Sequence, residues 1–288
     1  MSQTVNDNYP KKGQEMTDEQ IKQLAIQNMQ RQEVQNTGFP TEIISLPSKG
    51  ILYPENNPLR SGTIEMKYMT AREEDILTST NLIKQGVVLD KLMQSMIVSP
   101  IKYNDLVIGD KNAIMIASRI LGYGKQYEVE ITCPNCDKKT KLEVDLTTLP
   151  EKNIPDSVNL VGVNLFEFTL PQSQRVVTFK ILTHGDEKKI QYELDAIKKT
   201  AKRDSIDKEL TTRLKYIIQS IDGNTDKSAI NYFIDNELFA IDSKALRGYI
   251  KDVSPDQKFQ IEFQCNHCDH EEEALVFSID TNFFWPKS

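Results

Sequence analysis

Apolar residues are sparse at the N-terminus and predict a single amphipathic helix there. Thr17 and Gln20 fit a capping box, and Ile21 and Leu24 follow it at helical spacing. The helix is expected to run to about position 35. Because so few of its positions are apolar, it needs a partner surface to be stable.

The next stretch, residues 38–125, has the pattern of one strand followed by helices. Apolar and polar residues alternate in the strand, whereas the helices carry apolar residues three and four positions apart. The predicted elements are a strand at 63–69, a helix from the Thr70-x-x-Glu73 capping box to about Thr80, a helix between Gly86 and Pro100, and a helix capped by Asp110 that closes at Gly122 and Gly124.

Residues 150–253 begin with strand patterns and continue with helical ones. Strands are predicted at 166–170 and 176–182. The helical part includes a face formed by Leu210, Leu214, Ile217 and Ile221, and a last short helix that Ser243 is expected to cap.

Each of the two Cys-x-x-Cys pairs lies between two segments in which apolar and polar residues alternate. Strands at 127–132 and 141–146 enclose Cys133 and Cys136, and strands at 258–264 and 274–279 enclose Cys265 and Cys268. The second hairpin therefore repeats the first, with residues 137–264 between the two pairs.

The four cysteines in this pattern predict a structural zinc site. A Cys-x-x-Cys turn directs two sulfurs at one ion, and two such turns supply four tetrahedral ligands. A redox pair is the main alternative, but it needs a cysteine at a helix N-terminus rather than in a hairpin turn. Unreactive thiols are the other alternative, and four thiolates would also suit iron.

The histidines do not extend this site into a catalytic one. A catalytic zinc keeps one ligand position open, which four thiolates would close. The zinc deaminase signature needs a His-x-Glu before its cysteines, and no histidine precedes His184. We interpret His267 and His270 as surface side chains of the second turn and His184 as an exposed loop residue, so no enzymatic activity is expected.

Composition and charge narrow the class of partner. The chain has 288 residues and a net charge of −7, and acidic residues follow the second cysteine pair at 269 and 271–273. Phosphate would be repelled there, which argues against a nucleic-acid-binding zinc ribbon. No apolar run is long enough to cross a membrane and no signal peptide is recognisable, so we expect a soluble protein that is not secreted.

The C-terminal aromatic residues Phe283, Phe284 and Trp285 have two interpretations. They could pack into the chain's own core, or they could form a docking surface for a partner protein. The pattern does not choose between them.

The order of several short motifs resembles a known family. Those motifs are Leu46-Pro47-Ser48-Lys49-Gly50 with Tyr53, the segment from Thr70 to Leu77, Leu106-Val107-Ile108-Gly109-Asp110, Gly122-Tyr123-Gly124 with Tyr127, and Cys133-Pro134-Asn135-Cys136. In this order they resemble the baseplate hub or hub-assembly proteins of T-even-like contractile-tailed bacteriophages. The resemblance implies a non-enzymatic role among other tail baseplate proteins, in a virion made in the bacterial cytoplasm.

We therefore predict an α+β fold of a small strand-plus-helices unit, a split zinc ribbon of two knuckle hairpins, and a mixed β/helical insertion between them. The predicted boundaries are an arm at 1–37, the first unit at 38–125, the ribbon at 126–150 and 256–282, the insertion at 151–255 and the aromatic tail at 283–288. The predicted function is a structural hub component that binds structural Zn²⁺ and docks to other tail proteins, with no nucleic acid, membrane or small-molecule substrate. The alternatives are a transient assembly factor absent from the mature particle and a nucleic-acid-binding zinc-ribbon protein.

Overall fold

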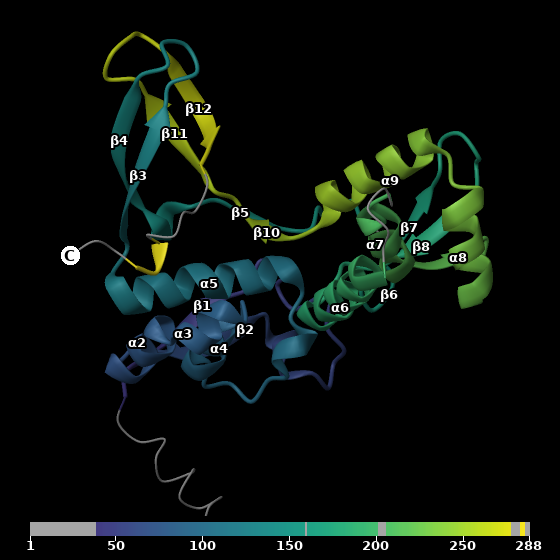
Figure 1. Cartoon of the computed structure of the whole chain (residues 1–288), viewed down its shortest axis with the longest axis horizontal. Coiled ribbons are helices and arrows are strands. Elements are labelled where there is room, and N and C mark those ends of the chain that lie inside the picture. The colour runs from purple at the N-terminus through teal and green to yellow at the C-terminus, as the bar shows by residue number, and fades with distance from the viewer. Residues whose placement is uncertain (1–38, 159, 201–205, 278–282, 286–288) are drawn as a thin grey trace, which may run out of the picture. The chain divides into compact units, whose positions relative to one another are not determined.

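We describe a computed structural model of the chain, covering residues 39–158, 160–200, 206–277 and 283–285 (Figure 1). The predicted N-terminal helix lies outside these residues. The chain divides into two units, residues 1–40 and residues 41–288, and everything below concerns the second. None of the described helices is both long and apolar enough to cross a membrane.

The fold is mixed α+β, as predicted, and its described sheets are antiparallel. The helices are α2 (Ala71–Thr78), α3 (Thr80–Lys84), α4 (Val88–Met96), α5 (Ile108–Tyr123), α6 (His184–Thr200), α7 (Glu209–Ile217), α8 (Lys227–Asn236) and α9 (Ala240–Val253). Short 3₁₀ turns are η1 (Pro58–Ser61), η2 (Tyr103–Asp105) and η3 (Leu146–Thr148).

The strands form one four-stranded sheet and several two-stranded ones. The larger sheet has the order β6 (Leu160–Gly162), β7 (Leu165–Thr169), β8 (Val176–Phe179), β9 (Ile218–Ile221). The pairs are β1 (Thr41–Ser45) with β2 (Thr63–Lys67), β3 (Gln126–Thr132) with β4 (Lys139–Asp145), β5 (Glu151–Lys152) with β10 (Asp256–Gln257), and β11 (Gln260–Gln264) with β12 (Glu271–Val276).

Helix α5 is the element on which several distant segments converge. Its Asp110 carboxylate accepts hydrogen bonds from the Ser48 backbone N–H at 2.9 Å, from the Ser48 hydroxyl at 2.6 Å and from the Tyr53 hydroxyl at 2.6 Å. The Tyr53 oxygen in turn accepts the Val107 N–H at 3.0 Å. The motif segments around Ser48, Tyr53 and Asp110 are thus parts of one buried network.

The return of the inserted residues is fixed on the same helix. A Cβ on Gly109 would lie 1.8 Å from the Pro255 carbonyl oxygen, so only glycine allows this close approach of the two backbones. Asn112 adds a hydrogen bond of 2.9 Å to Asp256. Both contacts hold β10, and with it the strands that lead to the second cysteine pair, against α5.

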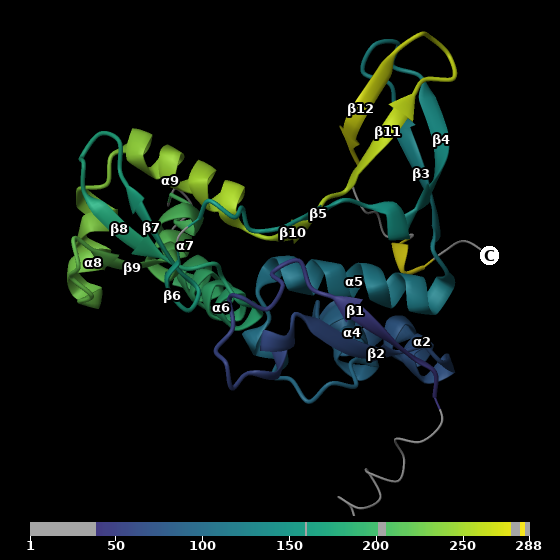
Figure 2. The same cartoon turned by 180° about the vertical axis from the view of Figure 1, so that it is seen from behind.

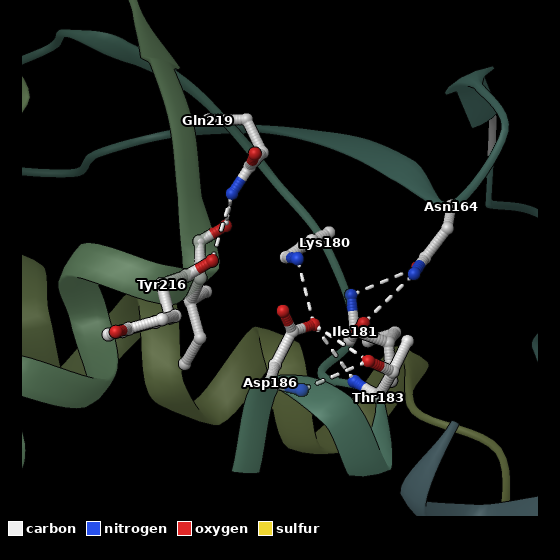
Figure 3. A network of polar contacts seen from close by, with 8 residues as sticks. Asn164, Lys180, Ile181, Thr183, Asp186, Tyr216 and Gln219 are labelled. Atoms are coloured by element: carbon white, nitrogen blue, oxygen red, sulfur yellow. Dashed lines mark hydrogen bonds and ion pairs between the residues drawn. The ribbon is translucent and has the colours of Figure 1, made fainter. Parts of the chain in front are cut away.

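A polar network at the end of β8 fixes the start of α6 (Figure 3). Asp186 accepts hydrogen bonds from Lys180 Nζ at 2.7 Å and from the Thr183 N–H at 3.1 Å, while its own N–H donates to the Thr183 hydroxyl. Although burial opposes ionisation, these donors lower the pKa of Asp186. Asn164 pairs with the Ile181 backbone in both directions, which ties the β6–β7 turn to the same segment.

Two of the predicted helix starts are wrong. Helix α5 begins at Ile108 after Val107, so Asp110 lies inside its first turn, where Ser48 and Tyr53 occupy its carboxylate. Helix α9 begins at Ala240, so Ser243 lies within the helix rather than at its cap.

The predicted helical face at 210–221 is helical only as far as Ile217. Helix α7 ends at Ile217, and Ile218–Ile221 form strand β9, which pairs with β8. The apolar residues at 217, 218 and 221 fit helical spacing, but residues 218–221 pair with β8 as the edge strand of the four-stranded sheet, so the pairing ends the helix. The capping box at Thr70 and Glu73 is confirmed.

Candidate metal centre

The two cysteine turns are closed by the same backbone hydrogen bond. In the first hairpin the Cys133 N–H donates to the Lys138 carbonyl at 2.9 Å, and in the second the Cys265 N–H donates to the His270 carbonyl at 3.0 Å. Each bond closes a turn of equal length between two strands, so the first cysteine of each pair is held at a strand end. The repetition predicted from sequence is present in the hydrogen bonding.

The four sulfurs converge although Cys136 and Cys265 are 129 positions apart in the sequence. All four lie within 4.8 Å of one another, with 3.8 Å between the Sγ atoms of Cys133 and Cys268 and 3.7 Å between those of Cys136 and Cys265. A tetrahedron with metal–sulfur bonds of about 2.3 Å has edges of about 3.8 Å. The spacing of the sulfurs therefore fits a four-thiolate metal site.

The surroundings of the sulfurs favour a thiolate at Cys265 but not at Cys136. Although a hydrogen bond from the Lys138 N–H acts to lower it, burial and the neighbouring thiols raise the pKa of Cys136 to about 12. Cys133 and Cys265 are buried, whereas Cys136 and Cys268 are partly exposed. The His267 backbone N–H donates to Cys265 Sγ at 3.4 Å, and the Asn135 side-chain amide donates to Cys268 Sγ at 3.7 Å. Burial works against ionisation of Cys265, but hydrogen bonds from the His267 N–H and neighbouring thiols lower its pKa to about 6.

The histidines near the second turn take no part in this cluster. Within the described residues, the cysteines alone form the group of potential ligands at this place. His267 is exposed, and His270 Nε2 lies 3.7 Å from a Glu272 carboxylate oxygen. Four sulfur donors around one point leave no ligand position for water, which suits a structural metal and not a catalytic one.

The aromatic tail packs against the chain itself. Phe283 and Phe284 are buried, and the Phe283 ring meets the Tyr127 ring edge-on at 5.1 Å between centroids. Trp285 is 37% exposed, and its indole N–H donates to the Leu77 carbonyl at 3.2 Å. These contacts agree with the core interpretation, and partner binding by the three residues stays a prediction.

His184 lies in a setting that the sequence did not reveal. We expected an exposed loop residue, but His184 is the first residue of α6 and only 4% exposed. Its Nδ1 lies 3.2 Å from Lys111 Nζ, its Nε2 lies 3.3 Å from an Asp90 carboxylate oxygen, and its ring packs on Tyr103. Its partners come from α4, η2 and α5, so no local sequence pattern could have found the cluster.

Taken together, these observations describe an α+β protein whose four clustered cysteines fit a structural metal site. A family model described as "T4 bacteriophage base plate protein" matches residues 51–285. Since the match covers most of the chain, this protein belongs to that family, and the family resemblance predicted from the motifs is confirmed. Searches of curated proteins and of solved structures gave no match. Family membership indicates a structural role in the phage tail alongside other tail proteins.

Proposed function

We propose that this protein is a structural subunit of the hub region of a contractile phage baseplate, in which one Zn(Cys)₄ site fixes the fold. The observation that carries the proposal is the family match over residues 51–285 together with four converging sulfurs inside the matched range. The zinc ligands would be Cys133, Cys136, Cys265 and Cys268.

The metal would act as a clip between two hairpins that are distant in sequence. The β3–β4 and β11–β12 hairpins belong to separate two-stranded sheets, so no ladder of backbone hydrogen bonds joins them (Figure 1). Four metal–thiolate bonds would join the hairpins at their tips. Because β5 and β10 lead from the hairpins into residues 153–255, the clip would also hold the ends of this insertion together.

The test is quantitative peptide mass spectrometry on gradient-purified phage particles, compared with the infected-cell lysate. A small fixed copy number per particle is the expected result for a baseplate subunit. A protein abundant in the lysate and absent from particles would contradict the structural role and identify a transient assembly factor. Zinc measured on the same purified protein should equal one ion per chain, and iron would be recognised by its visible absorption.

A further inference from the structure

Strand β1 has one edge that no described residue covers. It pairs only with β2, through the register Ile43 to Glu65 and Ile44 to Ile64. The Leu46 N–H donates to the Gly62 carbonyl at 2.9 Å, so the residue pairs at alternate positions, including Ile44 with Ile64, exchange the ladder bonds. The N–H and C=O groups of Thr41, Ile43 and Ser45 must therefore point away from β2.

The hydrogen bonds of strand β2 confirm which backbone groups of β1 point outward. The Glu65 carbonyl, across from Ile43, accepts the Val98 N–H at 2.9 Å on the far edge of β2. In an antiparallel pair, two opposite residues that do not bond to each other point their backbone N–H and C=O groups away from each other, toward the two outer edges of the sheet. One outer edge of this two-stranded sheet is thus covered, and the edge at Ile43 is free among the described residues.

An apolar groove of about 400 Å³ runs beside this edge. Figure 2 shows β1 lying along helix α5, which forms one side of the groove. Its apolar lining includes Ile43, Ile44, Ile116, Ile120, Leu146 and Leu149. Ile43 itself is 75% exposed, so together with the groove it forms an apolar surface that a partner chain would cover.

The charged residues that line the groove are all acidic. Glu42 and Glu151 are its charged lining residues, and no Lys or Arg lines it. Glu151 pairs with Lys49 at 2.9 Å, whereas the partner of Glu42 is the neutral Tyr68 hydroxyl at 2.9 Å. A segment that brings a cation to Glu42 would therefore gain an ion pair there.

We propose that the free edge of β1 receives an extended segment of another tail protein, which adds a strand to the β1–β2 sheet. Its backbone would pair with Thr41, Ile43 and Ser45, one or two apolar side chains would enter the groove, and a Lys or Arg would face Glu42. A helix could not satisfy the outward N–H and C=O groups of the edge. This inference rests on the proposed function, because it names the way in which the subunit contacts a neighbour.

A second copy of this chain fits the edge less well. An antiparallel β1–β1 pair centred on Ile43 would place Glu42 of each copy opposite Ile44 of the other. Glu42 would then remain without a cation. The charge at the edge therefore favours a basic segment from a different protein.

The first experiment places the photo-crosslinking amino acid p-benzoylphenylalanine at position 43 in infected cells. The matched control places it at Ile241 of α9, which is 57% exposed and does not line the groove. We expect position 43, and not position 241, to crosslink to one segment of a tail protein that contains Lys or Arg among alternating apolar residues. Absence of a crosslink, or a crosslink to this same chain, would overturn the proposal.

The crosslinked segment, made as a synthetic peptide, is then the probe for strand addition. It should slow amide hydrogen exchange at Ile43 and Ser45 in the purified protein. Ile43→Pro removes an outward N–H and leaves the β1–β2 ladder bonds in place, so it should weaken peptide binding at least tenfold. Ile241→Pro, in the first turn of α9 where proline is tolerated, should leave binding unchanged.

A charge variant keeps the proposal testable if Ile43→Pro lowers the melting temperature. Glu42→Lys changes an exposed side chain and should weaken binding of the basic peptide severalfold, with a smaller dependence of affinity on salt. Equal binding by wild type and both variants, without exchange protection, would rule out strand addition.

If the chain crosslinks to a tail protein at position 43 but is absent from particles, the structural function fails while edge docking stands. If the chain is present in particles but gives no crosslink, the structural function stands while edge docking fails.

Discussion

Asp110 is a fully buried carboxylate whose hydrogen-bond partners lie far away in the sequence. Burial raises its pKa, and the Ser48 and Tyr53 donors counteract that increase. All three donors, from Ser48 and Tyr53, point to this one carboxylate, so the loop at 46–53 depends on it. The local pattern predicted a helix cap at Asp110, because a sequence window of one helix contains neither partner.

Asp110→Ala should therefore destabilise the protein strongly. It leaves the Ser48 N–H, the Ser48 hydroxyl and the Tyr53 hydroxyl buried without their acceptor, and each such loss costs about 1–3 kcal/mol. We expect the free energy of unfolding to fall by at least about 3 kcal/mol in urea denaturation. Asp75→Ala, at an exposed position of α2, is the control and should change it by less than about 0.5 kcal/mol. A loss below about 1 kcal/mol for Asp110→Ala would show that the network is not needed for stability.

Substitution of the single residue Cys265 tests the proposed metal site. Cys265→Ser removes one of four thiolates, so the variant should release its metal and melt at a lower temperature. His267→Ala changes an exposed side chain in the same turn and keeps the backbone N–H that donates to Cys265, so it should retain one metal ion per chain. Metal content by mass spectrometry under native conditions and thermal melting distinguish the two. Full metal occupancy and an unchanged melting temperature in Cys265→Ser would refute the site.

The cysteines could be predicted as a site because the ligand type and the Cys-x-x-Cys spacing already carry the chemistry. Local capping chemistry likewise located the start of α2. Strand β1 was missed because its five residues have no clear alternation, and β9 was hidden because its apolar positions also fit a helix. What sequence could not supply were the pairings between distant segments, which depend on packing rather than on local pattern.

At the scale of elements, the cluster around His184 joins α4, α5, η2 and α6. Lys111 carries hydrogen-bond donors only, so His184 Nδ1 must be the acceptor of the contact and the neutral ring carries its proton on Nε2, toward Asp90. Burial, and then Lys111, lower the pKa of His184, with Lys188 acting in the same direction and Asp90 and Glu187 opposing them. A second proton on Nδ1 would face the Lys111 ammonium directly.

This arrangement predicts a loss of stability in mildly acidic solution. The pKa of His184 is lower in the folded protein than the unfolded value of about 6.5, so the unfolded chain binds more protons as the pH falls below about 7. The stabilisation is complete above that range and decreases as the pH falls toward the folded pKa. His184→Gln, which keeps an acceptor for Lys111, should show a flatter dependence between pH 7.5 and pH 6.

The measurement is urea denaturation at several pH values with bound metal determined in parallel, because metal affinity also depends on pH. His267→Gln is the matched control, since it removes a histidine outside the cluster, and it should follow the wild type. Parallel curves for wild type and His184→Gln would show that His184 makes no contribution to the pH dependence.

For the molecule as a whole, the cysteine site connects segments that otherwise meet through few backbone bonds. Cys133 and Cys265 belong to the same apolar cluster as Phe263 and Phe277, so packing supports the hairpins in addition to the proposed metal. The two hairpins lack a shared sheet, whereas β7, β8 and β9 are held by ladders and α5 by the buried Asp110 network. Stability should therefore be distributed unevenly along the chain.

Removal of the metal should loosen the hairpins selectively. After treatment with a strong chelator, we expect amide hydrogen exchange to accelerate by at least tenfold in β3, β4, β11 and β12, and to change little in β7–β9 and α5. The physical reason is that the ends of a long intervening segment are no longer joined at the hairpin tips, so each hairpin can open without unfolding the rest. Re-addition of one equivalent of Zn²⁺ should restore the original rates. Uniform acceleration along the whole chain would instead mean that the metal stabilises a single cooperative unit, and no change would mean that packing of the aromatic side chains holds the hairpins without it.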